Sequence, residues 1–146
     1  MRYGMTGTRE GVTDKQKAAF ELWLAFHPSV ELAHGAAIGA DEYVALRVAS
    51  HGNGSFCVAF PSNIPNQTSQ RAIKVSHEVH PERPPLERNQ DIVEYSNEML
   101  AFPGGMAEKR RSGTWATIRR ARRWGRSIQF FWPDGTVTKE PSHAAN

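Results

Sequence analysis

The feature that most constrains the fold is an alternation of apolar runs, glycine and helical spacing in the last third of the chain. An apolar run ends at residues 100–102, Pro103-Gly104-Gly105 interrupts it, and helical spacing extends over residues 111–125 before a second apolar run at 128–132. This order predicts strand, glycine turn, helix and strand. A helix that begins at such a turn directs unpaired backbone N–H groups and the positive end of its dipole toward one point, which favours a phosphate or another anion.

The same order occurs twice more. A strand candidate at residues 3–6 is followed by Gly7-Thr8-Arg9. A candidate at 30–33 is followed by His34-Gly35 and, where the next helix begins, by Gly39-Ala40-Asp41. One such turn is also an ordinary connection, and an aspartate near a helix start is favoured by the dipole alone. Three of them in one chain indicate a shared ligand site.

Five strand candidates alternate with helices, which predicts an α/β fold, a single Rossmann-like domain whose parallel sheet has helices on both faces. Right-handed crossovers place every strand-to-helix turn at the carboxyl edge of the sheet. Ligands of such folds bind where the strand order reverses, here between the first and fourth strands. The crevice would bring Gly7-Thr8-Arg9 close to Ser112-Gly113-Thr114. The three glycine turns predict a nucleotide or phosphorylated ligand. Because neither the dinucleotide fingerprint nor the Walker lysine motif is present, neither NAD nor ATP hydrolysis is indicated.

Positive charge is concentrated in one segment. Residues 109–126 contain eight basic residues and no acidic one, whereas the other ten basic residues are outnumbered by fifteen acidic residues. One interpretation is an anionic partner, whether a small ligand, a polynucleotide or an acidic surface. The alternative is a solvated helix face whose basic side chains pair with acidic residues elsewhere in an oligomer.

Length and composition exclude several classes of protein. The 146 residues, 39% of them hydrophobic, suit one domain with one core. No apolar run is long enough to cross a membrane, the first residues lack a signal-peptide segment, and Cys57 is the only cysteine. We therefore expect a cytoplasmic protein without a membrane partner. His77 and His80 have no third ligand at suitable spacing, so we expect no metal and no other cofactor.

Two segments depart from the alternation. Residues 61–85 hold five of the nine prolines and show no clear period, which predicts a mobile flap or insert beside the site. Residues 139–146 are expected to form a flexible tail, so that the domain covers residues 1–138. Trp23, Trp115 and Trp124 are candidates for exposed aromatic residues, which predicts a homo-oligomer.

The sequence resembles the small YspA-like members of the SMF/DprA–LOG (SLOG) superfamily, Rossmann-like proteins of bacteria and phages. The resemblance extends over about residues 3–136, apart from residues 61–85. It rests on four segments, Gly7-Thr8-Arg9, Gly35 with Gly39-Ala40-Asp41, Glu87-Arg88-Asn89 and Arg111-Ser112-Gly113-Thr114-Trp115. It implies a five-stranded parallel sheet of order 3-2-1-4-5 and a nucleotide or nucleotide-derived ligand.

One branch of the superfamily, the lonely-guy enzymes, cleaves the N-glycosidic bond of nucleoside monophosphates. Its motif is Pro-Gly-Gly-x-Gly-Thr-x-x-Glu, with a catalytic arginine upstream that Arg88 matches. Here seven residues separate Gly105 from Gly113, and Thr117 stands where the motif has glutamate. Threonine neither stabilises an oxocarbenium-like centre nor activates water, so the resemblance favours binding over turnover. The carboxylates that remain as substitutes are Glu87, Asp91, Glu108 and Asp41.

Three functions therefore compete. The first is binding of a nucleotide or nucleotide-derived molecule, cyclic and ADP-ribose-type ligands included, as a sensor or as a sponge that sequesters a signal in phage–host defence. The second is nucleoside 5′-monophosphate N-glycosidase activity, and the third is binding of single-stranded DNA. The ligand-binding candidates are Gly7, Thr8, Arg9, His34, Gly35, Gly39, Asp41, Arg88, Asn89, Pro103, Arg111, Ser112, Gly113 and Thr114.

Overall fold

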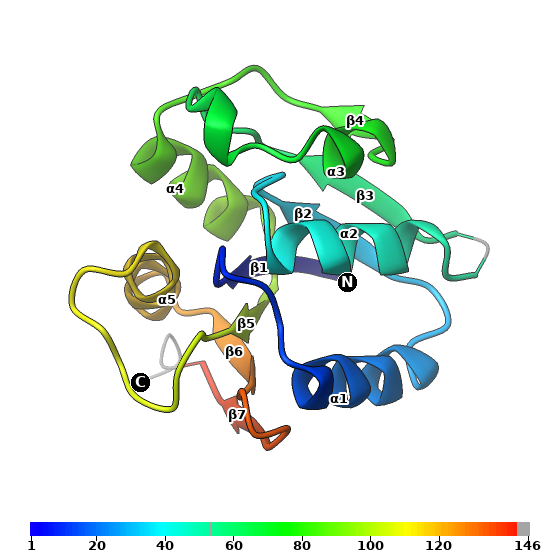
Figure 1. Cartoon of the computed structure of the whole chain (residues 1–146), viewed down its shortest axis with the longest axis vertical. Coiled ribbons are helices and arrows are strands. Elements are labelled where there is room, and N and C mark those ends of the chain that lie inside the picture. The colour runs from blue at the N-terminus through cyan, green and yellow to red at the C-terminus, as the bar shows by residue number, and fades with distance from the viewer. Residues whose placement is uncertain (53, 143–146) are drawn as a thin grey trace.

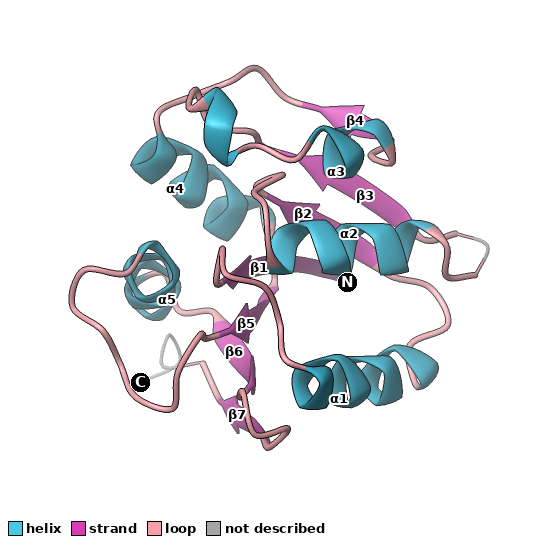
Figure 2. Ribbon diagram, in the orientation of Figure 1, coloured by secondary structure: helices cyan, strands magenta, loops and turns pink. Residues whose placement is uncertain are grey.

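The computed structural model describes residues 1–52 and 54–142. Within them one seven-stranded sheet has the order β4-β3-β2-β1-β5-β6-β7, with helices on both faces (Figure 1, Figure 2). The strands are β1 (Arg2–Gly7), β2 (Glu31–His34), β3 (Phe56–Ala59), β4 (Glu78–Val79), β5 (Glu98–Phe102), β6 (Ser127–Phe131) and β7 (Val137–Glu140). The helices are α1 (Asp14–Ala25), α2 (Ala40–Ala49), α3 (Gln70–Lys74), α4 (Pro85–Tyr95) and α5 (Gly113–Arg123), with a 3-10 turn η1 (Pro65–Gln67).

The centre of the sheet confirms the predicted order. The five predicted strands are β1, β2, β3, β5 and β6, which pair in parallel as β3-β2-β1-β5-β6. Both edges carry a further strand that the sequence analysis did not predict. The two-residue β4 pairs in parallel with β3, and β7 returns antiparallel to β6 as a hairpin. Neither edge strand has an apolar period, because both are largely exposed.

The β7 hairpin shortens the expected tail. Lys139 and Glu140 belong to β7, where Glu140 accepts two hydrogen bonds from Arg122 on α5. The sheet therefore extends beyond residue 138, since hairpin pairing and this ion pair hold polar residues that carry no hydrophobic signal. The last part of the expected tail, residues 143–146, lies outside the described residues.

Each face of the sheet has its own apolar core. On one face α1 and α2 pack through Phe20, Leu24 and Val44 against β1, β2 and β5. On the other face α4 and α5 pack through Val93 and Ile118 against β5 and β6. Figure 1 shows these helix pairs on opposite sides of the strands. No helix among the described residues has the length and apolar character needed to span a membrane.

The aromatic side chains correct part of the argument for an oligomer. Trp23 and Trp115, expected to be exposed, are buried in the two cores, and only Trp124 of these three is exposed. Helix α1 turns Phe20 and Leu24 inward and leaves Leu22 and Phe26 in solvent. A homo-oligomer remains a prediction, and its exposed apolar candidates are now Leu22 and Phe26 together with Trp124.

Residues 61–85, expected to be irregular, contain η1, α3 and β4. These elements are too short to show a period in the sequence. Ser69 caps α3 by accepting a hydrogen bond from the N–H of Ala72, and its hydroxyl donates to Glu42 on α2. The segment also holds the β2–α2 loop, because Gln67 accepts the N–H of Ile38 and Ala36 accepts that of Ser69. Its mobility remains a prediction.

Candidate functional site

A cleft of about 550 Å³ opens at the carboxyl ends of β1, β2 and β5. The strand order reverses here, because the chain passes from β1 to β2 on one side and β5 occupies the other. Most of the predicted site residues line this cleft. They are Gly7, Thr8, Arg9, Gly35, Asp41, Arg88, Asn89, Arg111, Ser112, Gly113 and Thr114.

The first turns of three helices border the cleft, those of α2, α4 and α5. At α5, Ser112 is the N-cap and its hydroxyl accepts the N–H of Trp115 at 3.3 Å. The N–H groups of Gly113 and Thr114 make no hydrogen bond within residues 1–52 and 54–142, and neither does the Thr114 hydroxyl. Because the N-terminal N–H groups of a helix have no partner inside it, this end of α5 is prepared for an anion.

The first turn of α2 presents one carboxylate, that of Asp41, to the cleft. Asp41 Oδ2 accepts the N–H of Gly35 at 2.8 Å and that of Ala37 at 3.3 Å. Its other oxygen, Oδ1, has no hydrogen-bond partner in the part of the chain that the structure describes. Burial raises the pKa of the Asp41 carboxyl, while Arg88 and the two N–H donors oppose that rise. The side chain is thus a hydrogen-bonding group fixed in place at the cleft wall.

Arg88 extends from α4 across the end of β2. Its Nη1 donates to the carbonyl oxygens of Gly35 at 2.5 Å and of Phe60 at 3.2 Å. No carboxylate of the described residues lies within ion-pairing distance of it. Burial lowers the pKa of the Arg88 guanidinium, Asp41 opposes this effect and Arg9 adds to it. A half-buried guanidinium without a counter-ion indicates a site for an anionic group.

Gly35 makes the approach of Arg88 possible. A Cβ atom at position 35 would overlap Arg88 Nη1, would lie 2.8 Å from Arg88 Cζ and 3.0 Å from Asp41 Oδ2. Any side chain there would therefore displace the guanidinium or the carboxylate. The glycine that the sequence analysis assigned to ligand binding serves to bring these two charged groups together.

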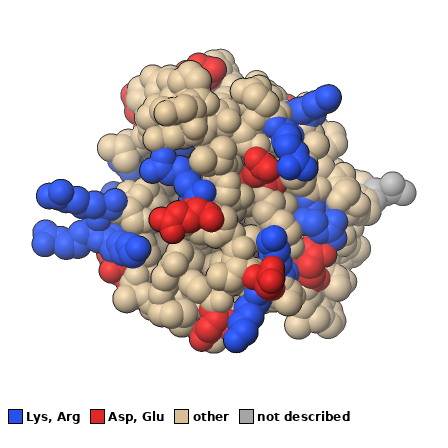
Figure 3. Space-filling view, viewed as in Figure 1, with Lys and Arg blue, Asp and Glu red and all other residues tan. Residues whose placement is uncertain are grey.

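The charged residues at the cleft are mainly basic. Arg9, Arg88, Lys109 and Arg111 line it, against Glu10 and Asp41. Figure 3 shows basic side chains extending from the side where Figure 1 draws the loop between β5 and α5. Arg9 and Arg111 make no ion pair within the described residues. The balance favours an anionic ligand.

Some other basic residues of segment 109–126 pair with acidic residues, as the interpretation of a solvated helix face predicts. Arg119 and Arg122 pair with Glu108, and Arg122 also pairs with Glu140. The acidic partners belong to the same chain and not to an oligomer. Arg120 donates to Gln90, and Arg126 donates to backbone oxygens of α4. These four arginines hold α5 in place, which leaves the residues of the preceding loop for a ligand.

No protein-family model matches this sequence, and no curated protein matches it. Solved structures with a similar fold include the following two. The X-ray structure of DNA processing protein A (DprA) from Streptococcus pneumoniae aligns with a TM-score of 0.65 and 19% identity over 87% of this chain and 48% of that one. The chain shares the Rossmann-like α/β fold of this structure.

The second similar structure is that of TM1055, a structural genomics target, with a TM-score of 0.61 and 14% identity over 88% of this chain and 72% of that one. The chain spans about half the length of the DprA structure. At these identities the likenesses concern the fold alone. They confirm the fold that the resemblance in sequence implied, and the ligand is left to the chemistry of the cleft.

Three predicted site residues do not line the cleft. His34 is fully buried, where its Nδ1 accepts the N–H of Ala36 and its Nε2 lies 2.8 Å from the Ser76 hydroxyl. Because Nδ1 accepts, the proton is on Nε2, which donates to Ser76. Burial, with a smaller effect of Arg88, lowers the pKa of His34 to about 3. His34 therefore holds the loop from beneath as a neutral side chain.

The other two also position the loops. Gly39 has a φ of +90°, and a Cβ there would meet the backbone of Thr8 and Arg9. Pro103 is buried, and its carbonyl oxygen accepts a hydrogen bond from Gln16 on α1. Both residues support the walls of the cleft without lining it. A position near the end of a strand therefore does not tell whether a residue lines the cleft or supports it.

The cleft also contains residues that the sequence analysis did not select. Gln67 reaches it from η1, and Thr117 lines it from the second turn of α5, with its hydroxyl bonded to the Gly113 carbonyl. Glu10 and Lys109 complete its charged rim. Lys109 was part of the basic segment, but Gln67 carried no signal.

Among the described residues, no group of three or more His, Cys, Asp or Glu side chains is arranged to hold a metal ion.

Proposed function

We propose that the protein binds a nucleotide or a nucleotide-derived small molecule in this cleft, cyclic and ADP-ribose-type ligands included. It would act as a sensor or as a sponge that sequesters a signal. We propose phage–host defence signalling as its biological context. The observation that carries the proposal is the unpaired guanidinium of Arg88 together with that of Arg9, at the point where three helices begin. Helix N-termini and arginine forks are the usual partners of phosphate groups.

The arrangement supports separate roles for phosphate and sugar. The free N–H groups of Gly113 and Thr114 and the rim residue Arg111 suit a phosphate. Asp41 Oδ1 is an acceptor without a partner among the described residues, and a ribose hydroxyl is a donor that fits it. A ligand that uses both ends of the cleft contains both groups.

Gly113→Ala tests the phosphate site with little effect on the fold. A Cβ at Gly113 would meet nothing within 4 Å, so the free protein has room for it. If a phosphate contacts the N–H groups there, the methyl group blocks its approach and affinity falls about tenfold or more. We would screen nucleoside mono- and diphosphates, cyclic dinucleotides, ADP-ribose and single-stranded DNA by calorimetry, and identify co-purifying molecules by mass spectrometry.

The outcomes separate the candidate ligands. Loss of nucleotide binding in Gly113→Ala with an unchanged melting temperature supports the proposal. Equal nucleotide affinity in both proteins, or no binding of any small molecule, would contradict it. Binding of DNA alone, with an affinity that falls steeply with salt, would favour the third function.

One observation also favours N-glycosidase activity as a second candidate. Of the four carboxylates that could replace the missing glutamate, Asp41 lines the cleft with Arg88, whereas Glu87, Asp91 and Glu108 do not line it. Its pKa is raised by burial, as suits a group that exchanges a proton. Release of free base from nucleoside monophosphates, abolished in Asp41→Asn, would establish turnover. Stable binding without release would leave the protein a pure binder.

A further inference from the structure

A second cavity, of about 470 Å³, lies beside the cleft. Its floor comes from the residues that follow β3 and β4, Phe60 and His80, and its roof from α4. Arg88 is the one residue that lines both this cavity and the cleft, as far as the described residues show. The volume is in the range of small-molecule sites.

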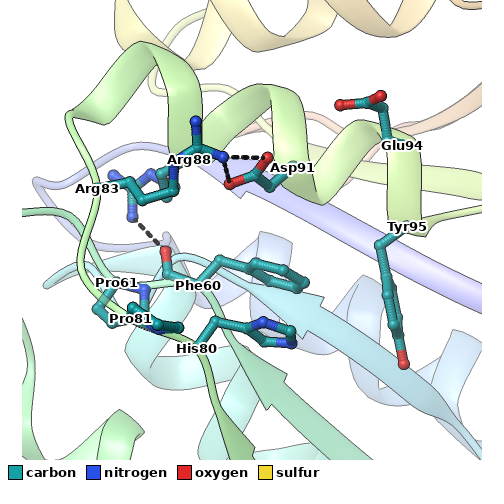
Figure 4. A pocket seen from close by; sticks show the side chains of 9 residues that line it. All are labelled: Phe60, Pro61, His80, Pro81, Arg83, Arg88, Asp91, Glu94 and Tyr95. Atoms are coloured by element: carbon teal, nitrogen blue, oxygen red, sulfur yellow. Dashed lines mark hydrogen bonds and ion pairs between the residues drawn. The ribbon is translucent and has the colours of Figure 1, made fainter.

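Aromatic rings form two walls of the cavity. Phe60 and His80 are stacked, with ring centroids 4.2 Å apart and an interplanar angle of 10°. Tyr95 and Phe60 are in edge-to-face contact, with centroids 5.6 Å apart and an interplanar angle of 62°. Figure 4 shows Tyr95 extending from α4 to one side of the Phe60–His80 pair. Such walls suit a planar ring, which gains stacking contacts on entering.

The cavity walls contain two buried polar atoms. Arg88 Nε and His80 Nε2 are buried and make no hydrogen bond within the described residues. Nε2 of His80 lies within ion-pairing distance of Glu78, at 3.3 Å, so Arg88 Nε is the one of the two without a partner among the described residues. Buried polar groups are nearly always satisfied, so this N–H indicates a missing partner.

The carboxylates at the rim differ in their state. Asp91 is occupied by Arg83, which donates to both its oxygens at 2.7 and 2.8 Å (Figure 4). Glu94 has no ion pair or side-chain hydrogen bond within residues 1–52 and 54–142. The cavity therefore offers a donor at Arg88 Nε and an acceptor at Glu94.

We infer that this cavity binds a nucleobase. The ring lies against Tyr95 and the Phe60–His80 pair, a ring nitrogen or carbonyl oxygen accepts from Arg88 Nε–H, and an N–H or amino group of the base donates to Glu94. Nucleobases carry donors and acceptors on the edge of a flat ring, and they stack on aromatic side chains. The base belongs either to the nucleotide whose phosphate occupies the cleft or to a separate base or nucleoside.

The experiment uses probes that contain either the base or the phosphate. Adenosine, guanosine, cytidine and uridine have a base and no phosphate, whereas ribose 5-phosphate has a phosphate and no base. We expect at least one nucleoside to bind the native protein, as measured by calorimetry and saturation-transfer NMR. Tyr95→Leu removes the aromatic wall and should weaken that binding about tenfold, as for a lost base–aromatic stack.

Glu94→Gln is the second variant, because Glu94 is exposed and its substitution leaves the fold intact. It should weaken binding of the same nucleoside, whereas Glu87→Gln, on the same helix but outside the cavity, should not. Affinity for ribose 5-phosphate should be equal in all these proteins. Native-like nucleoside affinity in both Tyr95→Leu and Glu94→Gln, or no binding of any of the four nucleosides, would overturn the inference.

Two further results assign the source of the base. A nucleoside monophosphate that spans both cavities should bind more tightly than its nucleoside and more tightly than ribose 5-phosphate. This additional affinity should be lost in Tyr95→Leu. Independent binding of nucleoside and ribose 5-phosphate indicates a separate ligand. Nucleoside binding without any phosphate binding would keep this inference and contradict the proposed function, so the two are tested apart.

Discussion

At the scale of single residues, Arg9 gives the most direct test of the cleft. Its side chain is exposed and makes no ion pair within the described residues, and it faces Arg88 closely enough to lower the pKa of that guanidinium. Arg9→Ala should therefore weaken binding of a phosphorylated ligand, while relief of like-charge repulsion leaves stability unchanged or slightly higher. Calorimetry with the identified ligand and a thermal melt check both results.

Arg123→Ala is the matched control, because Arg123 is an exposed arginine on α5 that does not line the cleft. It should leave affinity unchanged. Equal affinity in Arg9→Ala and Arg123→Ala would remove Arg9 from the site.

Two hydroxyl groups at the start of α5 make a paired prediction. Thr114→Val keeps the side-chain shape and removes a hydroxyl without a partner among the described residues, so it should cost about 1 to 3 kcal/mol of binding to a charged ligand and little stability. Ser112→Ala removes the N-cap and should cost about 1 kcal/mol of stability. Chemical denaturation and calorimetry on both variants measure the two quantities. A stability loss in Thr114→Val without an effect on binding would assign this turn to architecture alone.

At the scale of elements, residues 61–85 connect to the cleft through two backbone hydrogen bonds. The N–H of Ile38 donates to Gln67 at 3.1 Å, and the N–H of Ser69 donates to Ala36 at 2.6 Å. We predict that this segment exchanges its amide hydrogens fastest without ligand, and that ligand slows the exchange of Ile38 and Ser69 while β1 is unaffected. Hydrogen exchange with mass spectrometry measures this. Equally slow exchange in both states would show that the segment is not a flap.

At the same scale, strength of local signal decided what the sequence could predict. Strands β1, β2 and β5 each end at a glycine turn that leads toward a helix, so the pattern predicted the order of the central strands. It also predicted that Ser112-Gly113-Thr114 and Gly7-Thr8-Arg9 line the same cleft. The edge strands β4 and β7 are short and polar, and they exist because a neighbour pairs with them. The second cavity joins β3, β4 and α4, which no sequence period connects.

Position at a strand end also did not reveal which way a side chain points. His34 ends β2 and Asp41 begins α2, on the two sides of one loop, yet His34 turns beneath that loop and Asp41 faces the cleft. The hydrogen bond of His34 to Ser76 depends on α3, because Ser76 follows the end of that helix, which the sequence did not indicate. The resemblance in sequence selected Arg88, and only the structure shows that it makes no ion pair with a carboxylate of residues 1–52 and 54–142.

At the scale of the whole molecule, His34 predicts how stability depends on pH. Its pKa is about 3 in the folded chain, against an ordinary value of 6.5. As pH falls below 6.5, the unfolded chain binds a proton at His34 that the folded chain does not bind. The contribution of this group to the free energy of unfolding is therefore fully present above about pH 6.5 and is lost progressively between about 6.5 and 3. The slope from this group approaches about 1.4 kcal/mol per pH unit.

Denaturant unfolding at several pH values from about 7 down to about 4, which covers most of this window, should show the slope. His34→Asn is the matched variant, because it removes the titrating group while keeping a polar side chain. Its stability should be lower at pH 7 and should fall less steeply as the pH decreases. Parallel pH profiles for the two proteins would exclude His34 as the cause.

The contact between Gly35 and Arg88 has an evolutionary consequence. The two positions are far apart in the sequence, yet the space of a Cβ at 35 is taken by the guanidinium of residue 88. Among divergent descendants of this chain, a side chain at 35 should therefore occur only where residue 88 is no longer arginine in this position. An ancestor that acquired a side chain at 35 first would have displaced Arg88 before any replacement arose, so the order of substitutions along a lineage is constrained by sterics alone.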